Sequence, residues 1–233
     1  MKLDDIKEAF KFSLPIVLGY ITIGLPCGLL LSKVGMNPLQ VFLLSLLFYS
    51  GAGQFMVANM LMAGTPLASI VASVALVDTR HMLYSTSFAK YCQKIKKWKA
   101  FHFAATVTDE SYGVSVEKFQ NDPNWTVDKG LAVNIFCHST WIATNVIGSM
   151  LGNVVEIPLD IATYAMTAIF VCLVFTIDYK KADYVAVAIA VVSVIICKYV
   201  GLTNPAILIS SIIAVAGATL FSLAQERKEQ DVI

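Results

Sequence analysis

Residues 37–64 read "NPLQVFLLSLLFYSGAGQFMVANMLMAG", a stretch without a single charged side chain. A helix that crosses the hydrocarbon core of a bilayer needs about 20 mostly apolar residues. Six other stretches also meet this requirement: 11–35, 65–89, 130–152, 159–177, 182–201 and 204–224. The sequence therefore predicts an all-α, polytopic helical membrane protein. We expect seven to eight membrane segments in a single integral membrane transporter domain, residues 1–233.

The composition supports the same class. Hydrophobic residues make up 57% of the chain and charged residues 14%, whereas a soluble domain carries about 25% charged residues. The net charge of +1 gives no reason to expect a nucleic-acid partner. The five cysteines are an odd number and form no CxxC pair, so we expect neither a metal site nor a disulfide, and no cofactor.

The "SGAG" at 50–53 predicts a break within the opening stretch. Gly51 and Gly53 weaken a helix, and Gln54 offers a polar side chain next to them. Loose backbone at membrane depth occurs in transporters where it lines a cavity. The sequence therefore predicts a broken or re-entrant helix here. Segment 11–35 also contains prolines, and for it a break and an ordinary membrane helix are both open.

The distribution of lysines predicts an orientation. Segment 90–99, "KYCQKIKKWK", carries five lysines, which places it in the cytoplasm by the positive-inside rule. Segment 120–128 has no basic residue, which suits the outside. Lysines near the N-terminus also favour the cytoplasm, yet three apolar segments precede Lys90. Either the N-terminus lies outside, or one segment does not cross fully.

Residues 101–119 form a possible eighth segment that contains Asp109, Glu110 and Glu117. Three carboxylates make it a poor lipid-facing helix. It either crosses within the bundle or lies at a surface.

The stretch 76–85, "LVDTRHMLYS", places Asp78, Arg80 and His81 in apolar surroundings, where ionisable groups are rare and are functional by default. On a regular helix, Asp78 and Arg80 point about 200° apart. Asp78 and His81 share one face, and Tyr84 follows Arg80 on another. We therefore expect Arg80 to pair with a carboxylate of another segment, the candidates being Asp109, Glu110 and Asp160.

A stripe along segment 130–152 steps by three and four residues, from Asn134 and His138 to Gly148 and Gly152. The glycines predict close helix packing. Asn134 and His138 either line a path or hydrogen-bond neighbouring helices.

These features fit a solute transporter. A neutral amino acid carries a carboxylate that suits an arginine or a half-helix N-terminus, and an ammonium group that suits a carboxylate. His81 and the carboxylates are candidates for a coupling proton. No HExxH, GxSxG or phosphate-binding glycine loop occurs, so we expect no enzyme activity. A channel-like or scaffold subunit whose specificity comes from a partner is the alternative.

Several motifs resemble those of the AzlC family, the large subunits of branched-chain amino acid exporters. They are "SGAGQF" at 50–55, "DTRHMLYSTS" at 78–87, "TDESYG" at 108–113, "STWIATNVIGSMLG" at 139–152 and "LDIATYAMTAIF" at 159–170. The resemblance implies export of hydrophobic amino acids across the cell membrane and a small membrane partner of the AzlD type. Further oligomerisation is open. Family members often carry asparagine where this chain has Asp78.

The residues proposed for the substrate or ion pathway come from these motifs and from the physical argument together. They are Gly51, Gly53, Gln54, Asp78, Arg80, His81, Tyr84, Asp109, Glu110, Asn134 and His138.

Overall fold

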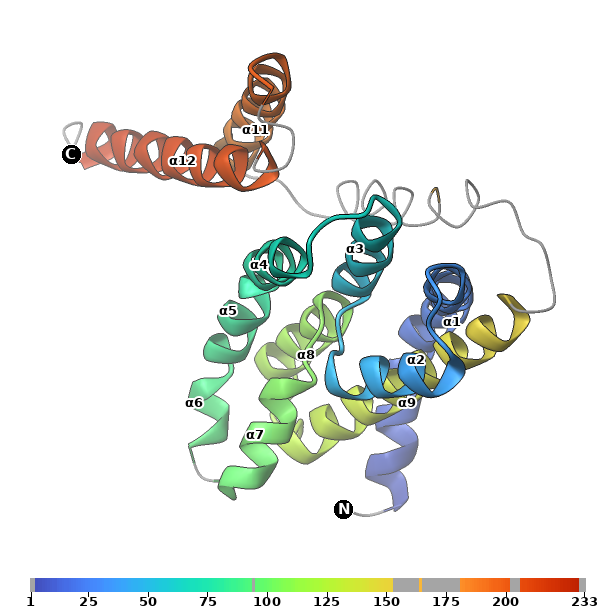
Figure 1. Cartoon of the computed structure of the whole chain (residues 1–233). Coiled ribbons are helices and arrows are strands. Elements are labelled where there is room, and N and C mark those ends of the chain that lie inside the picture. The colour runs from blue at the N-terminus through green and yellow to red at the C-terminus, as the bar shows by residue number, and fades with distance from the viewer. Residues whose placement is uncertain (1–2, 94, 153–163, 165–180, 202–205, 231–233) are drawn as a thin grey trace. The chain divides into compact units, whose positions relative to one another are not determined.

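A computed structural model describes residues 3–93, 95–152, 164, 181–201 and 206–230, and within them every regular element is a helix (Figure 1). The chain forms two compact units, residues 1–170 and 171–233. The first contains α1 (Leu3–Lys33), α2 (Pro38–Leu47), α3 (Gly51–Met62), α4 (Leu67–Val77), α5 (Thr79–Ser87), α6 (Ala89–Cys92), α7 (Lys97–Ala105), α8 (Asp109–Asn121) and α9 (Val127–Gly152). The second contains α11 (Lys181–Tyr199) and α12 (Ala206–Gln230), which pack on each other.

Helices α1 and α9 form the central pair of the first unit, and they run parallel. Glu8 near the start of α1 meets Lys129 near the start of α9, and Gly28 lies against the backbone of Asn145 further along both helices. Two long helices can approach this closely only where small residues lie between them.

The predicted close packing of Gly148 and Gly152 is confirmed. A Cβ atom at Gly148 would overlap the backbone of Leu25, and one at Gly152 would overlap the side chain of Ser32. Residues 11–33 of segment 11–35 lie within one continuous helix despite Pro15 and Pro26.

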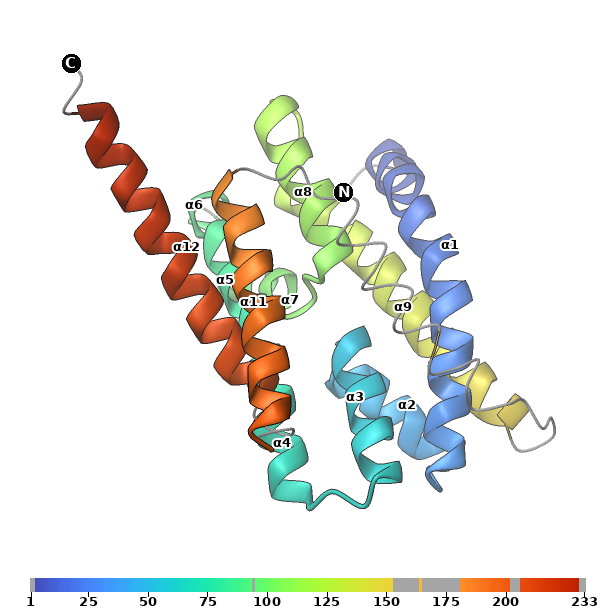
Figure 2. The ribbon, with the colours of Figure 1, turned by 90° about the horizontal axis from the view of Figure 1, so that it is seen from above.

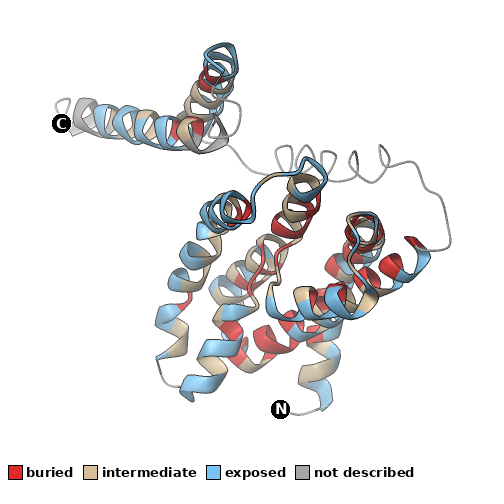
Figure 3. Cartoon of the chain, in the orientation of Figure 1, coloured by how far each residue is buried: buried red, intermediate tan, exposed pale blue. Residues whose placement is uncertain are grey.

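Buried residues of the first unit gather where α1, α2, α3 and α9 face one another (Figure 3). Outside this core, apolar side chains of α1 stay accessible, Leu18 being 57% exposed, as expected where lipid is the solvent. Two of the described helices are long and apolar enough to cross a membrane, α1 and residues 182–199 of α11. The count of seven to eight segments stays a prediction.

The predicted interruption in segment 37–64 is confirmed, because α2 ends at Leu47 and α3 begins at Gly51 with Ser50 as its N-cap. Two further segments are also divided. Segment 65–89 forms α4 and α5 and ends where α6 begins, and segment 101–119 is divided between α7 and α8.

The junction between α4 and α5 falls on the charged stretch. Asp78 adopts φ −84° and ψ −1° there, and the Thr79 hydroxyl donates to the carbonyl of Leu76 at 2.7 Å. Hydroxyl groups that bond the preceding turn compete with regular helix geometry and bend it. The face shared by Asp78 and His81 on a regular helix is therefore interrupted.

Several segments meet at one end of the first unit. Lys129 at the start of α9 lies 2.6 Å from Glu8 of α1, and Lys99 of α7 lies 2.6 Å from Asp128. Helix α8 ends at Asn121, shortly before α9 begins. The α7–α8 pair therefore starts and finishes at the same end, so it is not a single crossing. The prediction that segments 90–99 and 120–128 lie on opposite sides is wrong, because ion pairing holds them together.

Helices α2 and α3 lie instead along the C-terminal half of α1, whereas α8 lies along its N-terminal half (Figure 2). Helices α3 and α4 form a hairpin that returns to the interruption, where the Ser50 hydroxyl donates to Asp78 at 2.8 Å. The chain then continues through α5 and α6 to the lysine-rich segment. The α2–α3 pair thus returns to the end of the first unit from which it starts (Figure 2).

Candidate functional site

The predicted pairing of Arg80 with a carboxylate of another segment is confirmed. Arg80 Nη2 lies 3.0 Å from Asp109 Oδ2, and the two side chains are only 26% and 20% exposed. The hydroxyl of Tyr84, one turn after Arg80 on α5, donates to the other oxygen of the same carboxylate at 2.7 Å. Asp109 begins α8, where the helix dipole favours a negative charge. The α5 segment is thus tied to the interruption between α7 and α8.

Asp78 connects α5 to the other interruption. Its Oδ1 atom accepts from the Ser50 hydroxyl, whose oxygen in turn accepts from the Gly53 N–H at 3.0 Å. A Cβ atom at Gly53 would lie 2.9 Å from Asp78 Oδ2 and 2.5 Å from the ring of Phe48. Gly53 is therefore required by close packing against the carboxylate. Gly51 has more room, because a Cβ there would meet only Trp141, at 3.4 Å.

The charged groups leave one donor and one acceptor unused. Among the described residues, the buried atoms Arg80 Nε and Asp78 Oδ2 have no hydrogen-bond partner. A buried polar atom without a partner is costly, and in a native protein it points to strain, catalysis or a missing ligand. A guanidinium N–H and a carboxylate oxygen are the groups that would bind the two ends of a zwitterion.

Tyr20, in the middle of α1, lies between the two interruptions. Its hydroxyl is 2.8 Å from Thr108 Oγ1, and it donates to Glu110 Oε2 at 2.8 Å. Its ring lies edge-on to Tyr49, which is in the gap between α2 and α3. Sequence reasoning missed Tyr20 and Thr108. Thr108 carried a signal, because a threonine followed by two acidic residues is typical of a helix N-cap, and it caps α8.

Gln54 bridges the interruption between α2 and α3 by hydrogen bonds. Its side chain is fully buried. Its amide nitrogen donates to the carbonyl of Phe48 at 2.6 Å, and its oxygen accepts from Trp141 Nε1 at 3.2 Å. It therefore gives the carbonyl of Phe48 a second donor beside the Ser50 N–H and connects this carbonyl to α9.

His138 and Asn134, one turn apart on α9, make equivalent contacts to both interrupted pairs. His138 Nε2 lies 3.0 Å from the carbonyl of Ser45 near the end of α2. Asn134 Nδ2 donates to the carbonyl of Phe103 near the end of α7 at 3.3 Å. Of the two alternatives for these residues, the geometry corresponds to interhelical hydrogen bonding.

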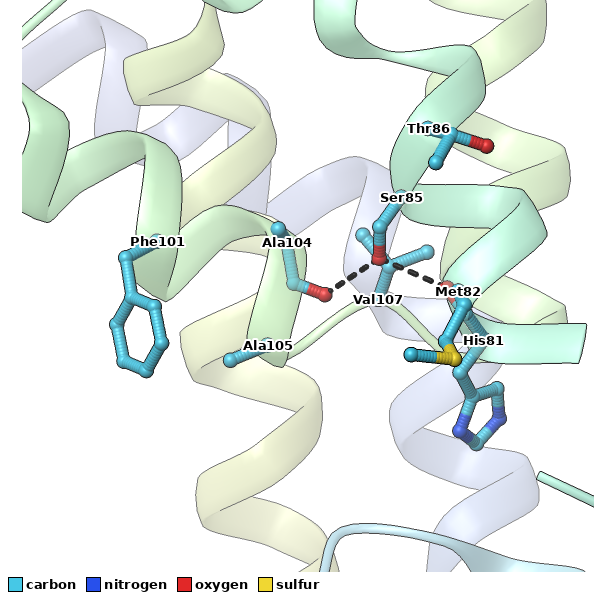
Figure 4. Close-up of a pocket in the computed structure, with 8 residues that line it drawn as sticks. All are labelled: His81, Met82, Ser85, Thr86, Phe101, Ala104, Ala105 and Val107. Atoms are coloured by element: carbon cyan, nitrogen blue, oxygen red, sulfur yellow. Dashed lines mark hydrogen bonds between the residues drawn. The ribbon is translucent and has the colours of Figure 1, made fainter. Parts of the chain in front are cut away.

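His81 also lines a pocket on the α7 side of α5. This open cavity of about 410 Å³ lies between α5 and α7 (Figure 4), and its Met82 and Phe101 side chains are 70% and 68% exposed. The lining is almost entirely apolar and comprises His81, Met82, Ser85, Thr86, Phe101, Ala104, Ala105 and Val107. Sequence periodicity did not identify this cavity, because its walls come from two separate helices.

The structure thus brings together Asp78, Arg80, Tyr84, Asp109 and the N-terminal ends of α3 and α8. Glu110 is linked to this group through the hydrogen bond that it accepts from Tyr20, and His81 borders the cavity. Asp160, the third candidate partner of Arg80, lies outside the described residues. Within the described ranges, no three His, Cys, Asp or Glu side chains are grouped so that they could hold a metal ion.

The known proteins that resemble this chain are named as membrane or transport proteins. The sequence model of the family described as AzlC protein matches residues 15–155. The inner membrane protein YgaZ of Escherichia coli is 32% identical over 63% of this chain and 60% of its own length, so the match spans less than two thirds of that relative.

An uncharacterized membrane protein of Helicobacter pylori is 29% identical over 94% of this chain and 96% of its own. The branched-chain amino acid transport protein AzlC of Bacillus subtilis is 26% identical over 71% of this chain and 65% of its own. No solved structure matches the chain.

Proposed function

The chain belongs to the AzlC family of membrane proteins, and from this premise we propose that it is the large subunit of a secondary exporter of branched-chain and other hydrophobic amino acids. The name of the Bacillus subtilis relative supports this substrate class. Export, the coupling ion and the cell-membrane location are parts of the proposal.

One observation carries the assignment. Arg80 and Asp109 form an ion pair beside two interrupted helix pairs, and Arg80 Nε and Asp78 Oδ2 have no partner among the described residues. A transported amino acid would place its carboxylate at the guanidinium group and its ammonium at Asp78. In transporters, half-helix ends and unwound backbone bind such charged groups.

We propose that a proton gradient drives the transport. Three titratable groups adjoin the substrate charges: Asp109, which pairs with Arg80; Glu110, which accepts from Tyr20; and His81, which borders the cavity. Ionisable residues within a membrane are typical of proton relays.

The proposal includes a small membrane partner of the AzlD type, which the family resemblance implies. The full chain would be reconstituted in proteoliposomes with and without the small apolar protein encoded beside it. Vesicles holding the same concentration of radiolabelled L-leucine inside and outside would then receive a pH gradient. Accumulation of leucine against its own gradient would support coupled transport and exclude a channel. Leucine flux that only equilibrates would favour a channel-like subunit.

A further inference from the structure

We propose that the apolar cavity between α5 and α7 receives the hydrocarbon side chain of the transported amino acid and sets the size selectivity. This inference rests on the proposed function and deepens it. It gives the substrate tail a binding place separate from the charges that hold the substrate head.

The two faces of α5 divide these tasks. Arg80 and Tyr84, one turn apart, both contact Asp109 on α8. One residue after each of them, His81 and Ser85 line the cavity, and the Ser85 hydroxyl donates to the carbonyl of Ala104 on α7 (Figure 4). The residues that bind charge and those that border the cavity are thus neighbours along one short helix. On the opposite wall, Val107 lies two residues before Asp109.

The lining fits a hydrocarbon chain. The only hydroxyl groups in the wall are those of Ser85 and Thr86, and Ser85 Oγ already lies 2.8 Å from the carbonyls of both His81 and Ala104. Ala104 and Ala105 leave space on the α7 side. A volume of about 410 Å³ lies at the lower end of the range for small-molecule sites, about 300–1,000 Å³, and the nearby unpartnered Arg80 Nε and Asp78 Oδ2 supply the complementary charges.

Two variants change the cavity in opposite directions. Ala104→Leu fills part of it, and Met82→Ala enlarges it. Leu83→Ala and Ala89→Leu are the matched controls, because they change volume at exposed positions outside the lining. Proteoliposomes would be tested for exchange of radiolabelled L-alanine, L-valine, L-leucine and L-phenylalanine.

We expect Ala104→Leu to lower the ratio of leucine to alanine exchange by about tenfold, since a methylene-sized change in an apolar pocket gives discrimination of roughly 10–200-fold. Met82→Ala should raise the ratio of phenylalanine to leucine, and both controls should keep the wild-type ratios. Residual alanine exchange by Ala104→Leu shows that the variant is folded.

Ratios that stay at the wild-type value in both cavity variants would overturn the subsite and leave the proposed function intact. Selectivity unchanged together with lost association of the small partner would also overturn it, in favour of a partner helix in this groove. Wild-type protein that exchanges none of the amino acids would overturn both proposals.

Discussion

Arg80 binds Asp109 through Nη2 of a planar group whose Nε has no hydrogen-bond partner among the described residues. Lysine keeps the positive charge, but it lacks the fork of donors that engages a carboxylate on two sides. We therefore expect Arg80→Lys to lose transport by at least about tenfold, as for a lost hydrogen bond to a charged group. Leucine efflux from preloaded cells measures this, with the amount of protein in the membrane as the control. Near-normal efflux by Arg80→Lys would show that charge alone suffices.

Asp78 accepts a hydrogen bond from Ser50 and presents a second oxygen without a partner. Asparagine retains one acceptor oxygen, so Asp78→Asn should lose no more than roughly fivefold in transport, the difference between a charged and a neutral hydrogen bond. Asp78→Ala should lose much more, because it removes both acceptors. The same efflux assay compares them. Equal loss in the two variants would move the essential chemistry onto the negative charge of Asp78.

Gly53 and Gly51 differ in the space around them although they lie two residues apart. A methyl group at Gly53 would press on Phe48 and Asp78, whereas one at Gly51 would only touch Trp141. We expect Gly53→Ala to destabilise the fold by about 1–3 kcal/mol, as for an overpacked core, and Gly51→Ala by clearly less. The unfolding temperatures of the detergent-solubilised variants test this order, and a reversed order would contradict the packing described for Gly53.

At the scale of helices, the interruption between α2 and α3 depends on side chains that replace missing backbone hydrogen bonds. Gln54→Leu leaves the buried indole N–H of Trp141 without a partner and removes the shorter of the two hydrogen bonds to the carbonyl of Phe48, whose other donor is the Ser50 N–H at 3.2 Å. Each buried unsatisfied group costs about 1–3 kcal/mol, so the variant should unfold at a lower temperature and transport poorly. Gln93→Leu, at an exposed position, is the control. An unfolding temperature equal to wild type would show that Gln54 does not hold this interruption.

The interruption between α2 and α3 could be predicted from the sequence, whereas those between α4 and α5 and between α7 and α8 could not. The paired glycines of "SGAG" weaken a helix by themselves, so this interruption is local in origin. The junction at Asp78 is not, because it combines the bond of the Thr79 hydroxyl to the backbone with the contact of Asp78 to Ser50 from another segment. Helix geometry predicted that Arg80 pairs with a carboxylate of another segment but left three candidates open, whereas the position of Tyr20 between two interruptions depends on tertiary packing that has no periodic signal.

At the scale of the first unit, the ion pairs explain why the lysines left the side of the N-terminus undecided. Lys129 with Glu8 and Lys99 with Asp128 hold the N-terminus, the lysine-rich segment and the start of α9 at one end. The α2–α3 and α7–α8 pairs each return to the end from which they start. All the lysines near the N-terminus and in 90–99 can therefore satisfy the positive-inside rule together.

This arrangement predicts which loops an external reagent reaches. Lys96→Cys and Asn124→Cys, both exposed, should resist an impermeant maleimide added to intact cells, because both lie at the lysine-rich end. Ala63→Cys, in the turn between α3 and α4, should react. Wild-type protein gives the background from the native cysteines, and burial raises the pKa of the Cys92 thiol within the lysine-rich segment, which slows its reaction. Labelling of Asn124→Cys without labelling of Lys96→Cys would mean that α7 and α8 cross the membrane together and would refute the shared end.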